Sequence, residues 1–320
     1  MKKIALVAAI AAFAAPAFAQ SSVTLWGRIN TTVESQKVGS GDRTVVVANN
    51  SSRLGFKGVE DLGGGLKASF YLEHGLNSDT GTVSNGGEFW GRASYVELGS
   101  SAMGAVRMGR WFPGSYYATA DYVSMHNHDT GSSSDALYSF QGFGNASKNK
   151  VAYFTPNFGG FTAEASVHAG EGVDKRSFDL SGNYDQGPLH LGAGYTKQGE
   201  AMQFAVRGLY ELGAFTFGGY YQREDAGSLV ATRSTRDIGR LAVVYTMGAS
   251  EFHLNVGGTK SGGLVSSGFR NNGAKQYTLG YNYNLSKRTK LYGFYTAVDS
   301  TAANSVGDFS SLAAGIRHNF

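Results

Sequence analysis

The stretch from Ser51 to Tyr71 reads SSRLGFKGVEDLGGGLKASFY and predicts a β-hairpin. Leu54 and Phe56 alternate with polar residues and glycine, which is the period of two that places strand side chains on opposite faces. The run Asp61-Leu62-Gly63-Gly64-Gly65 predicts a tight turn, and apolar residues alternate again as the chain returns. Arg53 falls on the face opposite Leu54 and Phe56, so it faces a lumen if the apolar face meets lipid.

The same alternation recurs along the whole chain, interrupted by two kinds of connection that follow one another strictly. Short connections are predicted at 61–65, 100–104, 158–160, 185–188, 212–214, 247–250 and 286–288. Longer polar connections are predicted at 37–44, 78–87, 113–147, 170–175, 199–201, 225–234, 261–274 and 300–306. Short turns on one rim and longer loops on the other are typical of membrane barrels.

The strands between these connections number sixteen, from near Val23 to Phe320. The predicted fold is therefore all-β, a sixteen-stranded antiparallel transmembrane β-barrel. A count of eighteen requires a hairpin hidden in the long connection after Phe112. A barrel of sixteen to eighteen strands leaves an aqueous channel, whereas side chains fill one of eight strands.

Residues 1–19 have the pattern of a secretory signal peptide. Lys2 and Lys3 precede an apolar segment at 4–15, and Ala17-Phe18-Ala19 is a small-residue cleavage site. The barrel is therefore predicted to occupy residues 20–320. No run of about 20 apolar residues follows the signal peptide, so no membrane helix is predicted. A closed barrel is the other structure that satisfies every backbone group within a bilayer.

Composition narrows the function classes. The formal charge of +4 falls to +2 once Lys2 and Lys3 are removed, and no basic run argues for nucleic acid. The 46 glycines, 18 tyrosines and 20 phenylalanines against 4 prolines suit strands joined by tight turns and not disorder. The absence of cysteine excludes disulfides, thiol catalysis and Cys-ligated zinc. No cofactor is expected.

Alternation also assigns a face to each strand residue. In the first predicted strand Arg28 lies opposite the apolar positions Val23, Leu25, Ile29 and Val33. Near residue 92 it groups Arg92 with Trp90 and Val96 as inward residues, opposite Phe89, Ala93 and Tyr95. In the last strand the residues on one face are Leu312, Ala314, Ile316, His318 and Phe320.

Several segments resemble the general diffusion porins of Gram-negative outer membranes. They are SVTLWGR at 22–28, SRLGFKG at 52–58 with EDLGGGLKA at 60–68, VRMGR at 106–110 and KVAYFTPNFGGF at 150–161. The terminal Phe320 also resembles the assembly signal of that family, which the barrel assembly machinery reads. The resemblance covers the whole mature chain, although the later strands match only in their alternation of apolar and polar residues.

The resemblance implies a homotrimer in the outer membrane, in contact with lipid and lipopolysaccharide, that passes small hydrophilic solutes and ions by passive diffusion. It implies that the third external loop, residues 113–147, folds inward and constricts the pore. The family's basic ladder falls on Arg28, Arg53 and Arg92, and the facing acids come from Asp121, Asp129 and Asp135. The start of the loop, Phe112-Pro113-Gly114, lacks the acid that well-known porins carry there. Weak anion selectivity is therefore expected.

Other interpretations remain open at this point. The aromatic residues of the chain, among them Trp111, Tyr116 and Tyr117, are typical of interface girdles, yet they could also line a channel specific for a sugar or an organic anion. His126 and His128 could form a metal pair, although a solvated loop is the commoner outcome, and no metal site is expected. No nucleophile elbow or similar motif is present, so no enzyme and no catalytic residue are expected. A structural or adhesive barrel would show no conductance.

Overall fold

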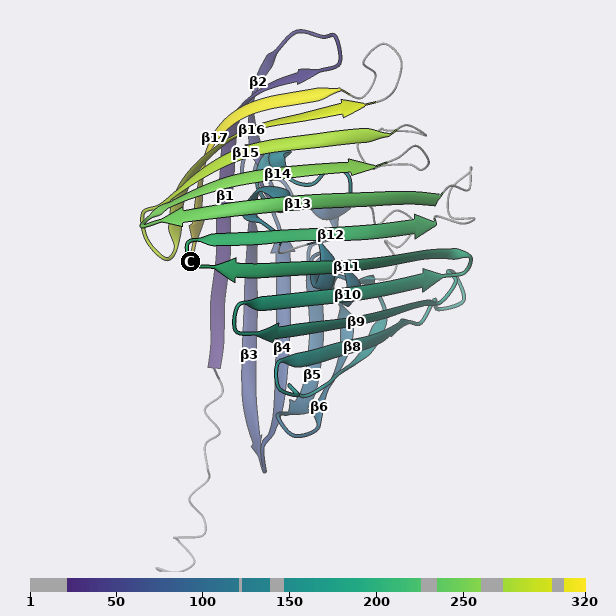
Figure 1. The fold of residues 1–320 in the computed structure, drawn as a ribbon. Helices are drawn as coiled ribbons and strands as arrows, with labels where there is room; N and C mark the ends of the chain where they lie inside the picture. Colours follow the sequence, from purple (N-terminus) through teal and green to yellow (C-terminus); the bar gives the residue numbers. More distant parts are fainter. Residues whose placement is uncertain (1–21, 121–122, 139–146, 226–234, 260–272, 301–307) are drawn as a thin grey trace, which may run out of the picture.

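The computed structural model describes residues 22–120, 123–138, 147–225, 235–259, 273–300 and 308–320. In these residues the chain forms one antiparallel sheet that curves round and closes on itself (Figure 1). The predicted signal peptide at 1–19 and Asp121 lie outside the described residues.

The sheet contains the great majority of the regular structure. Its strands are β1 (Ser22–Val38), β2 (Thr44–Asn49), β3 (Arg53–Gly63), β4 (Leu66–Gly75), β5 (Ala93–Ser100), β6 (Gly104–Arg110), β7 (Lys150–Phe154), β8 (Phe161–His168), β9 (Ser177–Gln186), β10 (Leu189–Gln198), β11 (Ala201–Leu212), β12 (Phe215–Asp225), β13 (Thr235–Met247), β14 (Ser250–Thr259), β15 (Ala274–Asn284), β16 (Thr289–Ser300) and β17 (Phe309–Asn319). The helical segments among the described residues are α2 (Gly114–Thr119) and the 3₁₀ turns η1 (Asn85–Gly87), η2 (Met125–Asn127) and η3 (Gly131–Ser133). None of the helices in the described ranges is long and apolar enough to cross a bilayer.

The seventeen strand segments make a barrel wall of sixteen strands. β3 pairs with the first part of β1, from Ser22↔Val59 to Arg28↔Arg53, and β2 pairs with its later part. These two segments are therefore halves of one wall strand, interrupted at 50–52. Pairing of β1 with β17, from Arg28↔Asn319 to Val38↔Phe309, closes the barrel. The predicted sixteen-stranded antiparallel barrel is confirmed.

The alternation of short and longer connections is also present. At the first short turn Gly63, Gly64 and Gly65 have φ values of +83°, +60° and +81°, a conformation that disfavours residues with a Cβ. One connection departs from the prediction, because Gln198 pairs with Ala201 across a tight turn at 199–200. Most of each of three longer connections, at 226–234, 260–272 and 301–307, lies outside the described residues.

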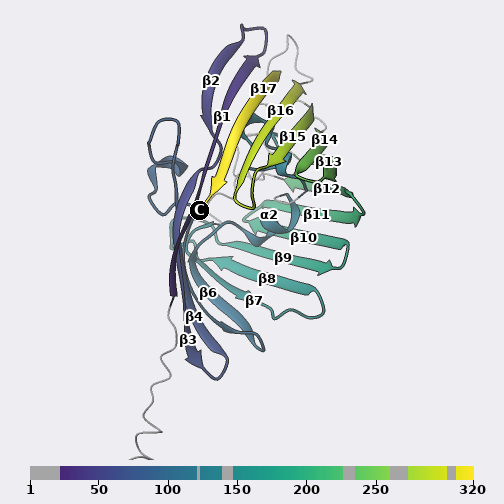
Figure 2. The same ribbon diagram turned by 90° about the vertical axis from the view of Figure 1, so that its left-hand side faces the viewer.

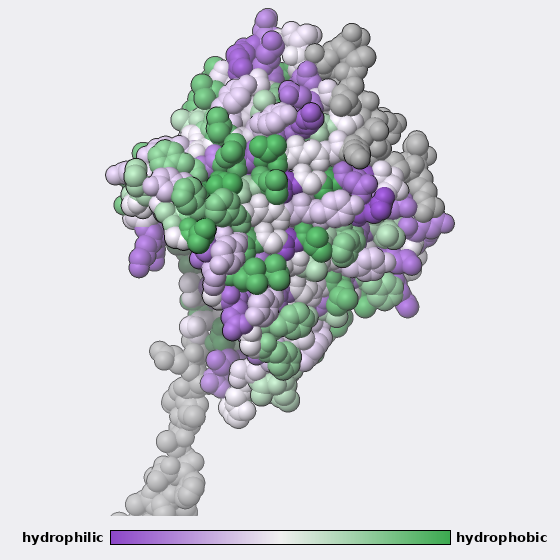
Figure 3. All heavy atoms as spheres, in the orientation of Figure 1, coloured by the Kyte–Doolittle hydropathy of each residue, from purple (hydrophilic) through white to green (hydrophobic). Residues whose placement is uncertain are grey.

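The outer wall is apolar and the inner wall is polar, the reverse of a soluble protein. Leu241, Leu279 and Leu312 expose 73%, 59% and 61% of their surface. Inward positions are polar and buried, as with Asn30 and Glu34 on β1. In Figure 3 hydrophobic residues gather over the strands while hydrophilic residues gather toward the rims. The facing predicted for the first and last strands matches this arrangement, with Arg28 inward and Ile316 and Phe320 outward.

The facing predicted around residue 92 is wrong. β5 begins only at Ala93, so Arg92 precedes the strand. Tyr95 points inward and stacks on Tyr71 with ring centroids 5.3 Å apart, whereas Val96 is 52% exposed on the outer surface. Arg92 still reaches the interior, because the connection before β5 directs its side chain, not the alternation within the strand.

Candidate functional site

The chain between β6 and β7, residues 111–149, is here called the inner loop, and its described residues 111–120, 123–138 and 147–149 lie inside the barrel. Its helix α2 packs on β9, β10 and β11 (Figure 2). The small residues Gly114, Ser115, Ala118 and Thr119 of α2 are buried against this wall. Tyr116 and Tyr117, on the other side of the helix, line a cavity in the lumen. The spacing of small and aromatic residues in α2 therefore decides which side faces the wall.

Glycines of the wall make room for α2. Gly192 and Gly194 of β10 both face inward, and a Cβ on Gly192 would overlap the carbonyl oxygen of Ala118. A Cβ on Gly194 would lie 2.5 Å from Ser115 Cα, well inside van der Waals contact. Asp179 of β9 accepts hydrogen bonds from Ser115 N at 3.1 Å and from Ser115 Oγ at 2.5 Å. Shape and hydrogen bonding together fix the helix.

His126 anchors the middle of the inner loop. Its ring lies against Gly280 of β15, and its Nε2 is 2.8 Å from Asn282 Oδ1. Burial, reinforced by the charge of His253, lowers the pKa of His126 to about 3. His128 points elsewhere, with its Nδ1 2.5 Å from the Tyr116 hydroxyl. The two histidines therefore have different partners, and within the described residues no group of three or more His, Asp or Glu is arranged to hold a metal ion.

Asp135 anchors the far end of the inner loop. Its carboxylate accepts hydrogen bonds from Arg240 Nε at 2.9 Å, from Arg240 Nη2 at 2.8 Å and from the hydroxyl of Tyr220. The side chains of Arg240 and Asp135 are 0% and 5% exposed. Burial of Asp135 opposes its ionisation, but the charge and hydrogen bonds of Arg240 outweigh it and hold the carboxyl pKa below its usual range.

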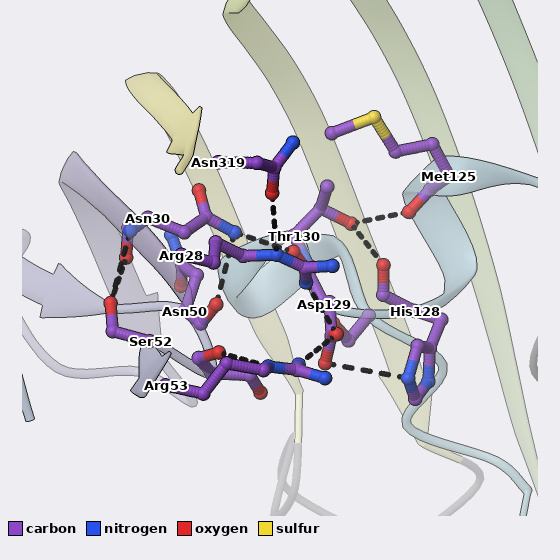
Figure 4. Close-up of polar contacts among 12 residues, drawn as sticks. Arg28, Asn30, Asn50, Ser52, Arg53, Met125, His128, Asp129, Thr130 and Asn319 are labelled. Atoms are coloured by element: carbon purple, nitrogen blue, oxygen red, sulfur yellow. Dashed lines mark hydrogen bonds and ion pairs between the residues drawn. The ribbon is translucent and has the colours of Figure 1, made fainter. Parts of the chain in front are cut away.

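Asp129 places a carboxylate between two arginines of the opposite wall (Figure 4). Its Oδ2 accepts a hydrogen bond from Arg28 Nη1 of β1 at 2.7 Å and another from Arg53 Nη2 of β3. Arg28 also donates through Nε to Asn319 Oδ1 at 3.2 Å, and Arg53 through Nε to the Ser51 carbonyl at 3.0 Å. Burial opposes ionisation of Asp129, yet the surrounding charges, Arg53 foremost, hold its pKa below the usual range.

Glu73 of β4 links Arg53 to Arg92. Arg92 Nε donates to Glu73 Oε1 at 2.6 Å, and Arg53 Nη1 lies 3.5 Å from the same oxygen. The Arg92 guanidinium also lies over the ring of Phe112, with Cζ 5.4 Å from the ring centroid. Arg28, Arg53 and Arg92 are thus connected through two carboxylates, Glu73 and Asp129.

A cavity of about 810 Å³ opens beside these residues. Its lining carries four arginines and two carboxylates, with aromatic rings from both the wall and the inner loop. The lining residues are Trp26, Arg28, Ser51, Arg53, Tyr71, Glu73, Arg92, Phe112, Tyr116, Tyr117, Ser124, Met125, His128, Asp129 and Arg317.

The structure brings together four of the six charged residues named from the sequence. Arg28, Arg53, Arg92 and Asp129 line this cavity, whereas Asp135 is buried at the far anchor and does not. Sequence reasoning missed Glu73 and Arg317. Arg317 was open to prediction, because it alternates with the outward Ile316 and His318 in the last strand.

The aromatic residues divide between the two sides of the wall. Tyr116 and Tyr117 line the cavity, and Tyr220 is buried inside the barrel. Tyr221, Tyr281 and Tyr283 are exposed on the outer surface. The last three occupy the outer surface, as girdle residues do.

Comparison with known proteins gives one consistent result. The family model described as Gram-negative porin matches residues 5–303. Outer membrane porin protein 32 of Delftia acidovorans is 34% identical, over 96% of this chain and 92% of the relative. The solved anion-selective porin from Comamonas acidovorans is 28% identical, with a TM-score of 0.76 over 94% of this chain and 100% of that one. OmpT of Vibrio cholerae, in a trimer form, shares the fold at 16% identity, with a TM-score of 0.70 over 94% of this chain and 99% of that one.

Proposed function

The chain belongs to the Gram-negative porin family, and we propose on that premise that the arginine-lined cavity is the narrowest part of its channel and favours small anions over cations. As a porin it forms a water-filled channel across the outer membrane, through which small hydrophilic solutes and ions diffuse passively. Porins are channels, and the proposal includes no catalytic step.

The charge balance of the cavity carries the proposal. Four guanidinium groups line it against the carboxylates of Glu73 and Asp129. Because both carboxylates already pair with arginines, they reduce the positive field without reversing it. In a channel with low-dielectric walls, such a field raises the local concentration of the oppositely charged ion. The porin from Comamonas acidovorans, named as anion-selective, supports the same sign.

The inner loop supplies the size limit in this proposal. Residues 113–147 act as the constriction loop, because the three anchors at Ser115, His126 and Asp135 hold its described parts against the wall. Solutes must then pass between the loop and the arginines. Apolar solutes are disfavoured, since they cannot replace the water that they displace from charged groups.

Assembly of the channel is part of the proposal. The chain is exported through the signal peptide at 1–19 and forms a homotrimer, with the apolar outer positions of β1 to β6 and β17 as the interface. Its remaining outer surface contacts lipid and lipopolysaccharide. Phe320, whose N and O bond to Gly27 O and N at 3.0 and 3.1 Å, supports a role for the last strand in closure by the barrel assembly machinery.

Ion selectivity tests the proposal directly. Purified protein is inserted into a planar bilayer under a KCl gradient, and the reversal potential is measured. The expected sign is that of a chloride-preferring channel. A potassium-preferring sign would overturn the proposed anion preference, and absence of conductance would contradict the channel itself.

A further inference from the structure

We propose that the cavity binds planar aromatic carboxylates, with the carboxylate at Arg92 and Arg28 and the ring against the aromatic side chains of the inner loop. The inference rests on the proposed anion preference and adds a chemical class of solute to it. Two features of the lining carry it, namely open guanidinium donors and a cluster of rings within reach of them.

Arg92 has donors to offer a carboxylate. Glu73 takes its Nε, which fixes the guanidinium plane. Within the described residues neither Nη1 nor Nη2 of Arg92 has a hydrogen-bond acceptor. Both nitrogens are accessible to solvent, since neither is among the buried atoms that lack a partner. Arg28 likewise commits its Nε and Nη1 and leaves Nη2 without an acceptor among those residues. Arg92, which keeps both Nη groups, can bind a carboxylate in a bidentate manner, whereas Arg28 offers a single nitrogen.

The rings stand beside these donors. Phe112 lies beneath Arg92, and its ring centroid is 6.2 Å from that of Tyr117, with the two planes at 90°. Tyr116 completes the cluster, with centroids 5.6 Å from Tyr117 and 6.1 Å from Phe112. Perpendicular and tilted arrangements at these separations are the ones that aromatic rings favour. A further ring entering the cavity meets Phe112, Tyr116 and Tyr117, which line it.

Tyr117 also lines more than one hollow of the lumen. It lines the arginine cavity and a second hollow of about 420 Å³, whose charged lining residues are Asp185, Glu211 and Arg207, with His190 beside the two carboxylates. Tyr117 therefore stands where the two hollows meet. The second hollow has two carboxylates and one arginine, whereas the first has four arginines and two carboxylates, so an aromatic acid is expected to dwell on the arginine side.

The combination discriminates among solutes. A neutral sugar can stack on a ring but leaves the arginine donors without a charged partner. An aliphatic acid of the same size satisfies the arginines but lacks the π system that gives an aromatic pair its additional attraction. The cavity of about 810 Å³ exceeds the volume of one such ligand, so binding stays weak enough for release, as conduction requires.

Current block tests this proposal. Benzoate, cyclohexanecarboxylate and benzamide are added in turn to single channels conducting KCl, and the concentration for half-block is measured. Benzoate is expected to block at a concentration about two- to tenfold lower than cyclohexanecarboxylate, the range given by an aromatic pair. Benzamide, which has the ring without the charge, is expected to block more weakly than benzoate. Equal block by the two acids would overturn the proposal.

Variants assign the effect to the cavity. Tyr117→Leu is expected to abolish the preference for benzoate over cyclohexanecarboxylate, and Tyr117→Phe to retain it. Tyr281→Leu, on the outer surface, is the matched control and should change nothing. A preference that survives in Tyr117→Leu would overturn the proposal. An anion-preferring reversal potential without benzoate preference defeats only this inference, whereas a cation-preferring one defeats the proposed function as well.

Discussion

Asp129 of the inner loop accepts a 2.7 Å hydrogen bond from Arg28 Nη1, across 101 positions of the sequence. The same carboxylate also binds Arg53, so one acidic residue ties the loop to two strands of the opposite wall. This contact has two consequences. It fixes the position of the loop across the lumen, and it removes part of the positive charge that the arginines would otherwise present to solutes.

Asp129→Asn is therefore expected to strengthen the preference for anions. Two unit charges 4 Å apart in water interact by about 1 kcal/mol, so loss of the carboxylate should raise the chloride-to-potassium permeability ratio roughly fivefold. Reversal potentials in a KCl gradient measure this ratio. Asp61→Asn, at an exposed short turn, is the control and should leave it unchanged. A lower ratio in Asp129→Asn would contradict the proposed charge balance.

The opposite change is expected from Arg53. Arg53→Gln removes one of the four cavity arginines and should lower the permeability ratio by a similar factor, and Arg53→Glu should shift it further toward cations. Arg288→Gln, in an exposed turn, provides a matched loss of charge outside the cavity. If Arg53→Gln and Arg288→Gln had equal effects, Arg53 would not lie at the narrowest point.

The depressed pKa of Asp129 predicts that its carboxylate stays ionised in mildly acidic solution. A carboxyl whose pKa is lowered by folding contributes stability at every pH above its ordinary value of about 3.9 and loses that contribution only as pH falls toward the lowered value. The difference in reversal potential between wild type and Asp129→Asn should therefore be the same at pH 7 and pH 4. Loss of about half that difference at pH 4 would indicate an ordinary carboxyl group.

Gly192→Ala is expected to loosen the inner loop. The added methyl would overlap the Ala118 carbonyl, and overpacking of this kind costs about 1–3 kcal/mol. The channel should show larger or fluctuating single-channel conductance while the barrel still resists unfolding in detergent. Gly239→Ala is the control, since a Cβ there meets no atom within 4 Å. Identical conductance traces for both variants would argue against the wall glycine as a seat for α2.

The buried pair of Asp135 and Arg240 predicts a double-mutant pattern. Removing one partner of such a pair costs about 3–5 kcal/mol, because the other charge is left buried, whereas replacing both by apolar residues is often neutral. Asp135→Leu alone should lower the melting temperature or increase current noise. Asp135→Leu combined with Arg240→Met should recover much of the loss. Additive damage in the double variant would mean that the two side chains act independently.

The sequence predicts the wall better than the lumen. Period-two alternation and turn residues are local signals, so the strands, the glycine turn at 63–65 and the inward position of Arg28 follow from it. Arg92 defeats alternation because a connection directs its side chain. Glu73 was missed because its pairing depends on how separate strands lie beside one another. The choice of Asp129 over Asp135 depends on the path of the inner loop, which distant wall residues decide.

The inward glycines of β10 and β15 are complementary in shape to the segment that packs on them. Gly192 and Gly194 leave the space that α2 fills, and Gly280 leaves the space that the ring of His126 fills. The position of these parts of the inner loop is therefore encoded twice, once in the loop sequence and once in the glycines of strands far from it in the chain. Homologues that keep these hollows should keep the same loop route, and those that fill them should have rerouted it. Grafting a foreign loop into this barrel would therefore also require substitutions at the wall positions beneath it.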